Sequence, residues 1–387
     1  MLMMLAKKLK WIDWSIVIIL GLFMVISTLT IRSATMNSTG FQGMEYRQLI
    51  NYALGFIVLA TAAMTNYRLL VKNAIYLYVL GVLSLVGVYF FGVIINGARG
   101  WFQLPGFALQ PAELMKLFLI IMVAYYLSRR GGEPLRLVED VLPTGLITFV
   151  PFALVLIQPD LGNAIIYVVI LIGMFWIANV RYVHVLAGIG IAAAFIAGVI
   201  FLLTAYHDPI EDFLQEHNSG HWMERVDAFL YPEEASDDET YQQRNSKRAI
   251  GSGALFGEGY MQGDSVQKGF IPYTYSDSIF VVIGEEFGFL GSSVLLLLYF
   301  LLIYRLILIS IHSSDQSGAY MIIGIVSMFV FQIFQNIGMF LGILPLTGIT
   351  LPFISYGGSS LLINMFCIGL ALSIRVHVDE PLDELHG

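Results

Sequence analysis

The chain has 387 residues, of which 57% are hydrophobic and only 12% are charged. Soluble domains carry about twice that charged fraction, so the composition excludes an ordinary soluble protein. The formal net charge is -8 and no basic block is present, so no nucleic-acid partner is expected, and the single cysteine, Cys367, excludes an internal disulfide.

Apolar runs recur along the whole chain, each with the length of about 20 residues that a helix needs to cross a bilayer. They predict an all-α polytopic membrane protein with ten spans, near 12–31, 48–65, 73–94, 111–128, 141–157, 164–180, 184–205, 279–304, 319–341 and 357–374. The first run is longer than the apolar core of a cleavable signal peptide, so we expect it to be retained. Residues 1–387 are predicted to form one integral membrane domain, with a large extracytoplasmic loop at 206–278 between the seventh and eighth spans.

The distribution of Lys and Arg in short loops predicts the orientation of these spans. One set of span ends carries most of the basic residues: Lys7, Lys8, Lys10, Arg68, Lys72, Arg129, Arg130, Arg136, Arg181, Arg305 and Arg375. The opposite short loops hold only Arg32, Arg47 and Arg99. The positive-inside rule therefore predicts that both termini are cytoplasmic.

This orientation sends every unusual loop to the outer face. The loops at 96–111, 158–164, 206–278 and 341–360 are the richest in Gly, Pro, aromatic and polar residues. Their gathering on one face predicts a shared outer cavity. Within 206–278, the stretch IGSGALFGEG is not a Walker loop, because no GK[ST] follows. It either brings backbone N–H groups to a phosphate or forms a re-entrant turn.

Ionisable residues within or beside membrane spans tend to mark function. Glu113 and Lys116 stand three residues apart on one helix face and can pair. They form either a structural ion pair or a site for pyrophosphate binding or proton passage. Asp160, in QPDLGNA, lies at an outer helix end, where it either caps the sixth span or serves the outer cavity.

Asp277 occupies a similar position, in the stretch IPYTYSDSIF just before the eighth span. It is either a helix cap or the base of a reaction at the membrane surface. Glu285 and Glu286 follow it on the same predicted helix. Because adjacent helical residues point about 100° apart, at most one of these two acids is expected to face the same cavity as Asp277.

Five segments together resemble the SEDS family (shape, elongation, division and sporulation). In chain order they are NGARGWFQLPGFALQPAELMK, QPDLGNA, YQQRNSKRAIGSGALFGEG, YSDSIFVVIGEEFGFLG and NIGMFLGILPLTGITLPFISYGGSS. The resemblance covers nearly the whole chain. It implies a peptidoglycan glycosyltransferase of the bacterial cytoplasmic membrane that polymerises lipid II at the outer face.

The resemblance also implies partners, namely a class B penicillin-binding protein and the membrane proteins of an elongation complex. The run VIGEEFGF is closest to the elongation member of the family, since the division member commonly has Ala before the paired acids. A division or sporulation paralogue is the alternative within the family. Outside this enzyme class, a lipid II flippase or other transporter and a non-catalytic scaffold are the competing interpretations.

Two motifs depart from the family pattern. Asn245 stands where Gln usually precedes the Ser of the YQxxQS motif. The family commonly reads LPExHTDFIF, whereas Tyr273 and Tyr275 replace the Glu and the His in this chain. These replacements weaken a mechanism that needs a histidine beside the aspartate, but Asp277 itself is kept.

The implied reaction needs a base for a sugar hydroxyl and positive charge for the leaving pyrophosphate. Asp277 is predicted to be the general base or, alternatively, the ligand of a divalent cation, Mg²⁺ or Mn²⁺, which Asp160 could also hold. No organic cofactor is expected. Lys116 and Arg248 are the preferred pyrophosphate ligands, and Arg99, Arg225 and Lys268 are further candidates. The residues predicted either to line the sugar site or to shape its loops are Gln110, Asn336, Thr347, Ser355, Tyr356 and Ser359.

Overall fold

The computed structural model describes residues 12–37, 40–95, 98–104, 107–206, 209 and 237–377. All ten predicted spans are helices in this part of the chain. They are α2 (Trp14–Thr35), α3 (Met44–Met64), α5 (Ala74–Phe91), α6 (Pro111–Ser128), α7 (Leu142–Ile157), α8 (Leu161–Ile177), α9 (Tyr182–Ala205), α14 (Ile279–Ile311), α15 (Gln316–Leu341) and α16 (Gly358–Val376). The fold-class prediction is therefore confirmed.

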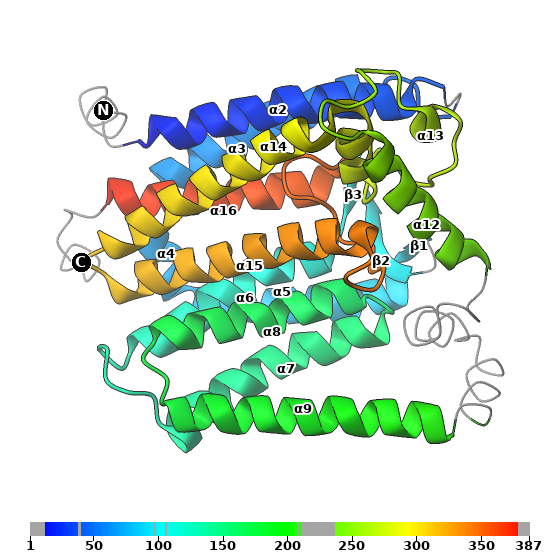
Figure 1. Cartoon of the computed structure of the whole chain (residues 1–387). Coiled ribbons are helices and arrows are strands. Elements are labelled where there is room, and N and C mark those ends of the chain that lie inside the picture. Colours follow the sequence, from blue (N-terminus) through cyan, green and yellow to red (C-terminus); the bar gives the residue numbers. More distant parts are fainter. Residues whose placement is uncertain are drawn as a thin grey trace, which may run out of the picture.

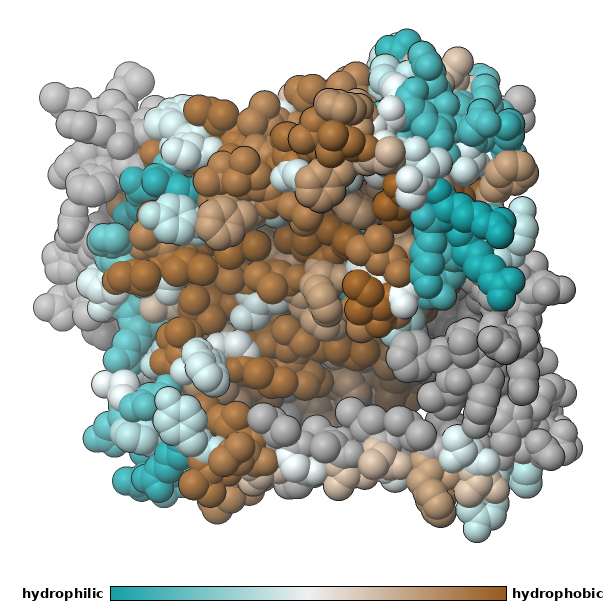
Figure 2. Space-filling model, in the orientation of Figure 1, coloured by the Kyte–Doolittle hydropathy of each residue, from teal (hydrophilic) through white to brown (hydrophobic). Residues whose placement is uncertain are grey.

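These helices have the properties of membrane spans. Eight helical segments are long and apolar enough to cross a bilayer within the residues described, and α8 is a shorter apolar helix of 17 residues. Figure 2 shows a broad hydrophobic band over the middle of the bundle, with hydrophilic surface toward its two ends. Large apolar side chains such as Ile18, Leu83, Phe149, Trp176 and Phe300 are exposed on the helices. An apolar surface of this extent is suited to contact with lipid, so the chain is a multi-pass membrane protein.

Helix α6 lies at the centre of the bundle. Almost every side chain from Ala112 to Ala124 is buried, because this helix is apolar on all its faces. It packs against α5, α8, α15 and α16. Any charged group on α6 is consequently placed inside the protein.

One end of the bundle brings together the start of α2 and the end of α16. Asp13, the N-cap of α2, accepts hydrogen bonds from Arg305 and Arg375, with 2.6 Å between its Oδ2 and Arg305 Nη2. The short elements α4 (Tyr67–Lys72) and η1 (Leu137–Val141) connect spans.

The opposite end, the loop end, carries the polar connections between the helices (Figure 1). It holds the helices α12 (Asp237–Ser252) and α13 (Asp264–Gln267) and the loop 342–357. It also holds a three-stranded antiparallel sheet of β1 (Val93–Ile95), β2 (Ala98–Leu104) and β3 (Phe107–Leu109). The sequence analysis predicted neither the sheet nor α12.

Helix α14 is interrupted near its loop end. Gly288 has φ 62° and ψ -157°, which breaks the helical path. A Cβ atom at this position would lie 2.4 Å from the backbone nitrogen of Gly257, so only glycine fits. The break admits the glycine-rich loop 253–259 to the backbone of α14.

This loop replaces the hydrogen bonds that α14 loses at the break. Glu258 N donates to Glu285 O at 2.9 Å, and Gly259 N donates to Glu286 O at 3.1 Å. On the other side of the break, Phe289 N donates to Ala254 O at 2.9 Å. The loop is a re-entrant segment, and these two of its N–H groups serve α14 instead of a phosphate.

Candidate active site

Asp277 lies at the loop end, in a tight turn that immediately precedes α14. The carbonyl of Tyr273 accepts hydrogen bonds from Ser276 N at 2.9 Å and Ser278 N at 3.3 Å. Ser278 Oγ donates to Pro272 O at 2.9 Å. From α15, Asn336 Nδ2 donates to Asp277 O at 2.8 Å. The backbone of the acid is thus held from both sides.

The Asp277 carboxylate is half-buried and faces the loop 342–357. A side chain at Gly348 would begin 3.9 Å from Asp277 Oδ2. Within the described ranges, no side chain donates a hydrogen bond to this carboxylate, and only the nearby N–H groups of Asp277 and Ser278 stabilise its charge. Burial outweighs them and raises the pKa of Asp277 to about 6. The group is therefore mostly ionised at neutral pH yet basic enough to take a proton.

Asp160 lies at a second site, where it caps α8. Its Oδ1 accepts from Asn163 N at 3.1 Å, and its Oδ2 accepts from Asn163 Nδ2 at 2.8 Å and Gln110 Nε2 at 3.1 Å. Burial raises the pKa of Asp160. The capping role predicted for Asp160 is formed, and Asn163 is the partner that the sequence analysis overlooked.

Glu113 and Lys116 form the predicted pair within α6. Lys116 Nζ is 2.7 Å from Glu113 Oε1, and the Lys116 side chain is 0% exposed. The second oxygen of Glu113 has no hydrogen-bond partner among the described residues. The pair lies close enough to Asp160 to act on its charge. Asp160, Glu113, Lys116, Gln110 and Asn163 are called the inner polar cluster below.

The loop 342–357 passes close to the turn of Asp277 and to the first turn of α8, which Asp160 caps. A side chain at Gly348 would begin 3.9 Å from Asp277 Oδ2. A side chain at Gly162, in the first turn of α8, would begin 3.3 Å from Thr347 O. Tyr356 N also donates to Tyr275 O at 2.9 Å. One loop therefore packs against the segments that carry both acids.

Several residues predicted to line a sugar site are engaged in the loop structure itself. Asn336 Nδ2 donates to Ile349 O at 2.7 Å, and Ser355 Oγ accepts from Leu351 N at 2.8 Å. Ser359 Oγ accepts from Gln110 N at 3.2 Å and donates to Ala108 O. Thr347 Oγ1 accepts from Gln335 Nε2 at 3.1 Å. These contacts support the scaffolding alternative, while Tyr356 and Gln110 stay partly exposed.

The predicted pyrophosphate ligands are not gathered around Asp277. Arg99 on β2 and Arg248 on α12 are exposed, and Lys268 forms an exposed ion pair with Asp264 at 2.6 Å. That pairing raises the pKa of Lys268. Arg225 lies outside the described residues. Among the predicted cations in the described residues, Lys116 is the one that is buried, and it pairs with Glu113 near Asp160.

Lys247 is a cation that the sequence analysis missed. Its Nζ lies 2.1 Å from the position that a Cβ on Gly342 would take, so its amine covers the C-terminus of α15. A positive charge at this place is favourable because helix C-termini carry partial negative charge. The signal in the sequence was the glycine that ends α15, but the lysine comes from a distant segment.

The paired acids Glu285 and Glu286 join α14 to α13 and to α2. The Glu285 carboxylate accepts Ser265 N at 2.7 Å and Val266 N at 3.1 Å, which caps α13. Glu286 accepts a hydrogen bond from Ser33 Oγ on α2. Neither acid has a recorded contact with Asp277 in the described structure, so both brace the protein around the site.

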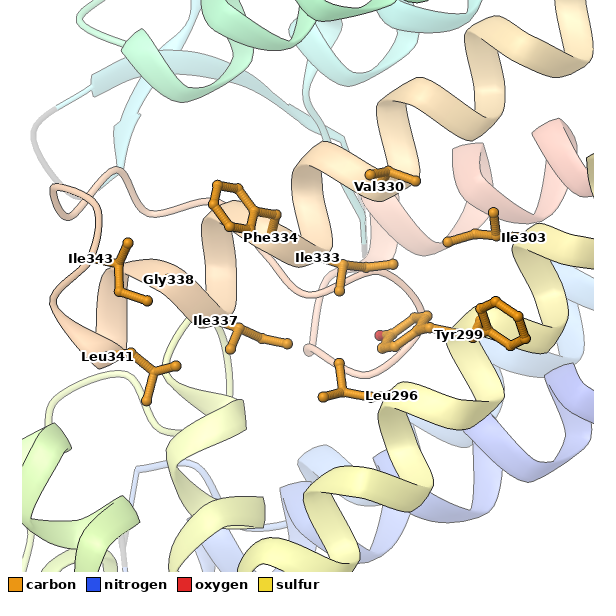
Figure 3. A pocket seen from close by; sticks show the side chains of 11 residues that line it. Leu296, Tyr299, Ile303, Val330, Ile333, Phe334, Ile337, Gly338, Leu341 and Ile343 are labelled. Carbon is orange, nitrogen blue, oxygen red and sulfur yellow. The ribbon is translucent and has the colours of Figure 1, made fainter.

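An apolar groove of about 370 Å³ lies between α14 and α15. Figure 3 shows side chains of both helices directed into it. It extends to Leu341 and Ile343 at the loop end, and its lining is Leu296, Tyr299, Phe300, Ile303, Val330, Ile333, Phe334, Ile337, Gly338, Leu341 and Ile343. Such a groove suits an apolar chain and provides no group for chemistry.

The carboxylates described near the site are too dispersed to form a metal centre of protein ligands alone. Within the described residues, no group of three or more His, Cys, Asp or Glu side chains is close enough to hold an ion. Mg²⁺ commonly binds proteins through one or two carboxylates and completes its shell with water and substrate phosphates. The single carboxylate of Asp277 fits that arrangement only when a phosphate substrate supplies the other ligands.

Comparison with known proteins extends over the whole chain. The model of a cell cycle protein family that groups FtsW, RodA and SpoVE matches residues 7–380. The peptidoglycan glycosyltransferase MrdB of Escherichia coli K12 is 35% identical over 378 residues, which is 96% of each chain. A probable peptidoglycan glycosyltransferase FtsW of Trichlorobacter lovleyi is 31% identical over 97% of this chain and 96% of its own.

A solved structure also matches this chain over nearly its full length. A chain from a peptidoglycan synthase complex, described for its coordination of polymerisation and crosslinking, superimposes with a TM-score of 0.77 and 29% identity. The match covers 96% of this chain and 99% of the other.

Proposed function

The chain belongs to the FtsW, RodA and SpoVE family of cell cycle proteins, the SEDS family, and we propose that it is a peptidoglycan glycosyltransferase that polymerises lipid II into glycan strands. The enzyme class follows from relatives that share its full length and carry that activity in their names. One observation carries the assignment of the site. Asp277 is a half-buried acid with a pKa of about 6, in the turn that immediately precedes the apolar helix α14.

The proposed reaction joins two lipid-linked sugars. A hydroxyl oxygen of one sugar attacks the anomeric carbon of the other, and the bond from that carbon to undecaprenyl pyrophosphate breaks with inversion. Asp277 removes the hydroxyl proton as the new bond forms. Because both substrates are tethered to the bilayer by their tails, the base has to lie at the membrane surface. In this proposal, the turn before α14 lies at that surface.

The leaving pyrophosphate needs positive charge. Lys116 is buried near Asp160, where it pairs with Glu113. Arg248, Arg99 and Lys268 are exposed at the loop end, where an anionic substrate can reach them from the solvent. Asp277 is also the residue that would hold Mg²⁺ or Mn²⁺ together with the substrate phosphates. When bound, the cation neutralises charge on the departing pyrophosphate.

We further propose the elongation role, as in RodA, on the basis of VIGEEFGF. We place both termini in the cytoplasm and the loop end outside, following the Lys and Arg pattern. A class B penicillin-binding protein is the proposed partner within an elongation complex. Its support is the similarity to a synthase complex that couples polymerisation to crosslinking.

The test is polymerisation of lipid II by the purified protein with its partner in liposomes. We expect glycan chains that form in the presence of moenomycin. Lipid II that crosses the bilayer without being polymerised would instead support a flippase. The Asp277→Asn variant serves as the inactive reference. If this variant still polymerises lipid II, Asp277 does not have the proposed role.

A further inference from the structure

Four aromatic side chains meet beside Asp277, and the reaction as described above does not use them. They are Phe41, Tyr273, Tyr275 and Tyr356, called the aromatic cluster below. Phe41 comes from the connection between α2 and α3, Tyr273 and Tyr275 from the turn before α14, and Tyr356 from the loop 342–357. Three segments distant in the sequence thus bring rings to one place.

Tyr275 packs against the rings of Phe41 and Tyr356, and Tyr273 lies near Tyr275 in the same turn. The ring centroids of Phe41 and Tyr275 are 4.7 Å apart, and those of Tyr275 and Tyr356 are 6.2 Å apart in an edge-on arrangement. The hydrogen bond from Tyr356 N to Tyr275 O, at 2.9 Å, fixes two of the segments to each other. Thr274 Oγ1 reaches Ala34 O at 3.4 Å, which joins the turn to the end of α2.

The aromatic cluster is next to Asp277, and two of its side chains are exposed to solvent. Tyr275 is close enough to Asp277, Tyr273 and Tyr356 for their charges to influence its phenol. Tyr273 is 44% exposed and Phe41 is 38% exposed. Tyr275 and Tyr356 are half-buried, and Tyr275 packs against Phe41.

Tyr273 is held in an unfavourable backbone conformation. Its φ of 54° lies in the left-handed region, which costs a residue with a side chain about 1–2 kcal/mol. Its carbonyl accepts the two hydrogen bonds that close the turn around Asp277. Such strain persists where the surrounding structure enforces it, and it is common at binding and catalytic sites.

We propose that the aromatic cluster is a stacking site for a pyranose ring of the substrate, with Tyr273 and Phe41 as its exposed surface and Tyr275 and Tyr356 as its support. The proposal rests on the proposed function, because it places a sugar beside the base. One face of a pyranose is made of C–H groups that carry slight positive charge, and the face of an aromatic ring is negative. Tyrosines bind such a face without a large loss of side-chain entropy, since they have few rotatable bonds.

Anchoring to the membrane interface is the other use of exposed tyrosines. An anchor acts alone and needs no particular neighbour. The cluster instead has rings from three segments packed against one another, in a turn whose hydrogen bonds also position a carboxylate. This arrangement favours a ligand site over an anchor.

The test compares substitutions that keep the ring with substitutions that remove it. Tyr273→Phe and Tyr275→Phe keep the aromatic face, whereas Tyr273→Leu and Tyr275→Leu replace it with an apolar side chain of similar bulk and, at 273, similar backbone strain. The matched control is Phe90→Leu, an exposed aromatic at the end of α5. KM and kcat for lipid II are measured for each variant, together with the melting temperature.

We expect the Leu variants to raise KM by about three- to tenfold, as the loss of one aromatic contact predicts. The Phe variants and Phe90→Leu should keep the KM of the parent protein. A KM that is unchanged in both Leu variants, or raised equally by Phe90→Leu, would overturn the stacking site and leave the glycosyltransferase assignment intact.

A binding experiment separates this proposal from the enzymatic one. Saturation-transfer NMR with the soluble N-acetylglucosaminyl–N-acetylmuramyl disaccharide reports sugar binding without turnover. We expect a signal from the parent protein and from Asp277→Asn, and its loss in Tyr273→Leu. If the parent protein binds the disaccharide in this manner but never polymerises lipid II, the stacking site stands and the proposed function fails. An absence of binding in the parent protein contradicts the stacking site.

Discussion

Asp277 and Asp160 are two half-buried acids in segments that pack against the loop 342–357, and their hydrogen-bond partners differ sharply. Asp160 accepts three hydrogen bonds from the side chains and backbone of Asn163 and Gln110. Asp277 receives only local N–H groups within the described structure. The other groups of the inner polar cluster are likewise paired, with Lys116 bound to Glu113.

The difference distinguishes a carboxylate that positions a helix from a carboxylate that can act as a base. The carboxylate of Asp160 positions the helix that it caps, and its oxygens are already engaged by Asn163 and Gln110, which leaves fewer lone pairs for a substrate hydroxyl even though burial raises its pKa. A carboxylate that is desolvated and lacks side-chain donors is less stable as an anion, and it gains from accepting a proton. Four experiments test this contrast, in decreasing order of expected effect.

The first experiment removes the acid that lacks partners. We expect Asp277→Asn to lower kcat for lipid II polymerisation by about 10²–10⁴-fold, because general bases contribute that much. The amide keeps the size of the side chain, so the melting temperature should stay the same. Asp264→Asn, an exposed acid paired with Lys268, is the control and should retain full activity. Equal rates for Asp277→Asn and the parent would exclude Asp277 as the base; the predicted alternative, a helix cap, is not formed, because the N-cap of α14 is Ser278.

The second experiment breaks the ion pair of the inner polar cluster. Lys116→Met leaves Glu113 buried without its partner, and we expect a loss of about 3–5 kcal/mol in unfolding free energy. Chemical denaturation in detergent measures it. Adding Glu113→Gln to this variant removes the stranded charge, so the double variant should recover most of the stability. A double variant that is stable but inactive would assign Lys116 to pyrophosphate binding as well.

The third experiment uses pH. A base works only when it is deprotonated, and the pKa of Asp277 is raised to about 6. We therefore expect kcat to be level above this pH and to fall about tenfold for each pH unit below it. Steady-state rates between pH 4.5 and 8 check this expectation. A rate limb near pH 4, the ordinary range of an aspartate, would contradict the effect of burial.

The fourth experiment loosens the support of the site. Glu285→Gln keeps the shape but removes the charge that accepts Ser265 N and Val266 N. Loss of charge-assisted hydrogen bonds predicts a destabilisation of about 1–3 kcal/mol. We expect a lower melting temperature and faster proteolysis at α13, with KM less affected than in Tyr273→Leu. Unchanged proteolysis would show that α13 does not depend on this cap.

The sequence was sufficient for the spans because long apolar runs have few alternatives in a membrane. It was insufficient for α12, whose residues DDETYQQRNSKRAIGS are polar and resemble a solvated loop. The break in α14 also escaped prediction, since VIGEEFGFLG has the composition of an uninterrupted helix. What reveals Gly288 as a break is the approach of the loop 253–259, which is a tertiary contact.

The candidate site likewise has features that the sequence predicts and features that only tertiary contacts reveal. Asp277, Asp160 and the Glu113–Lys116 pair were recognisable because ionisable groups beside apolar runs are unusual. Their different surroundings were not recognisable, because Gln110 and Gly348 come from remote segments. Lys247 and Phe41 were overlooked for that reason, since each acts on a partner that only folding brings near.

The interruption at Gly288 makes α14 two rods joined end to end. The first rod begins at Ile279, shortly after Asp277, and the second continues to Ile311. Torsion at a single glycine can change the angle between the rods without sliding the second rod against its neighbours. The position of Asp277 at the loop end can thus be adjusted while the long apolar part of the same helix keeps its packing.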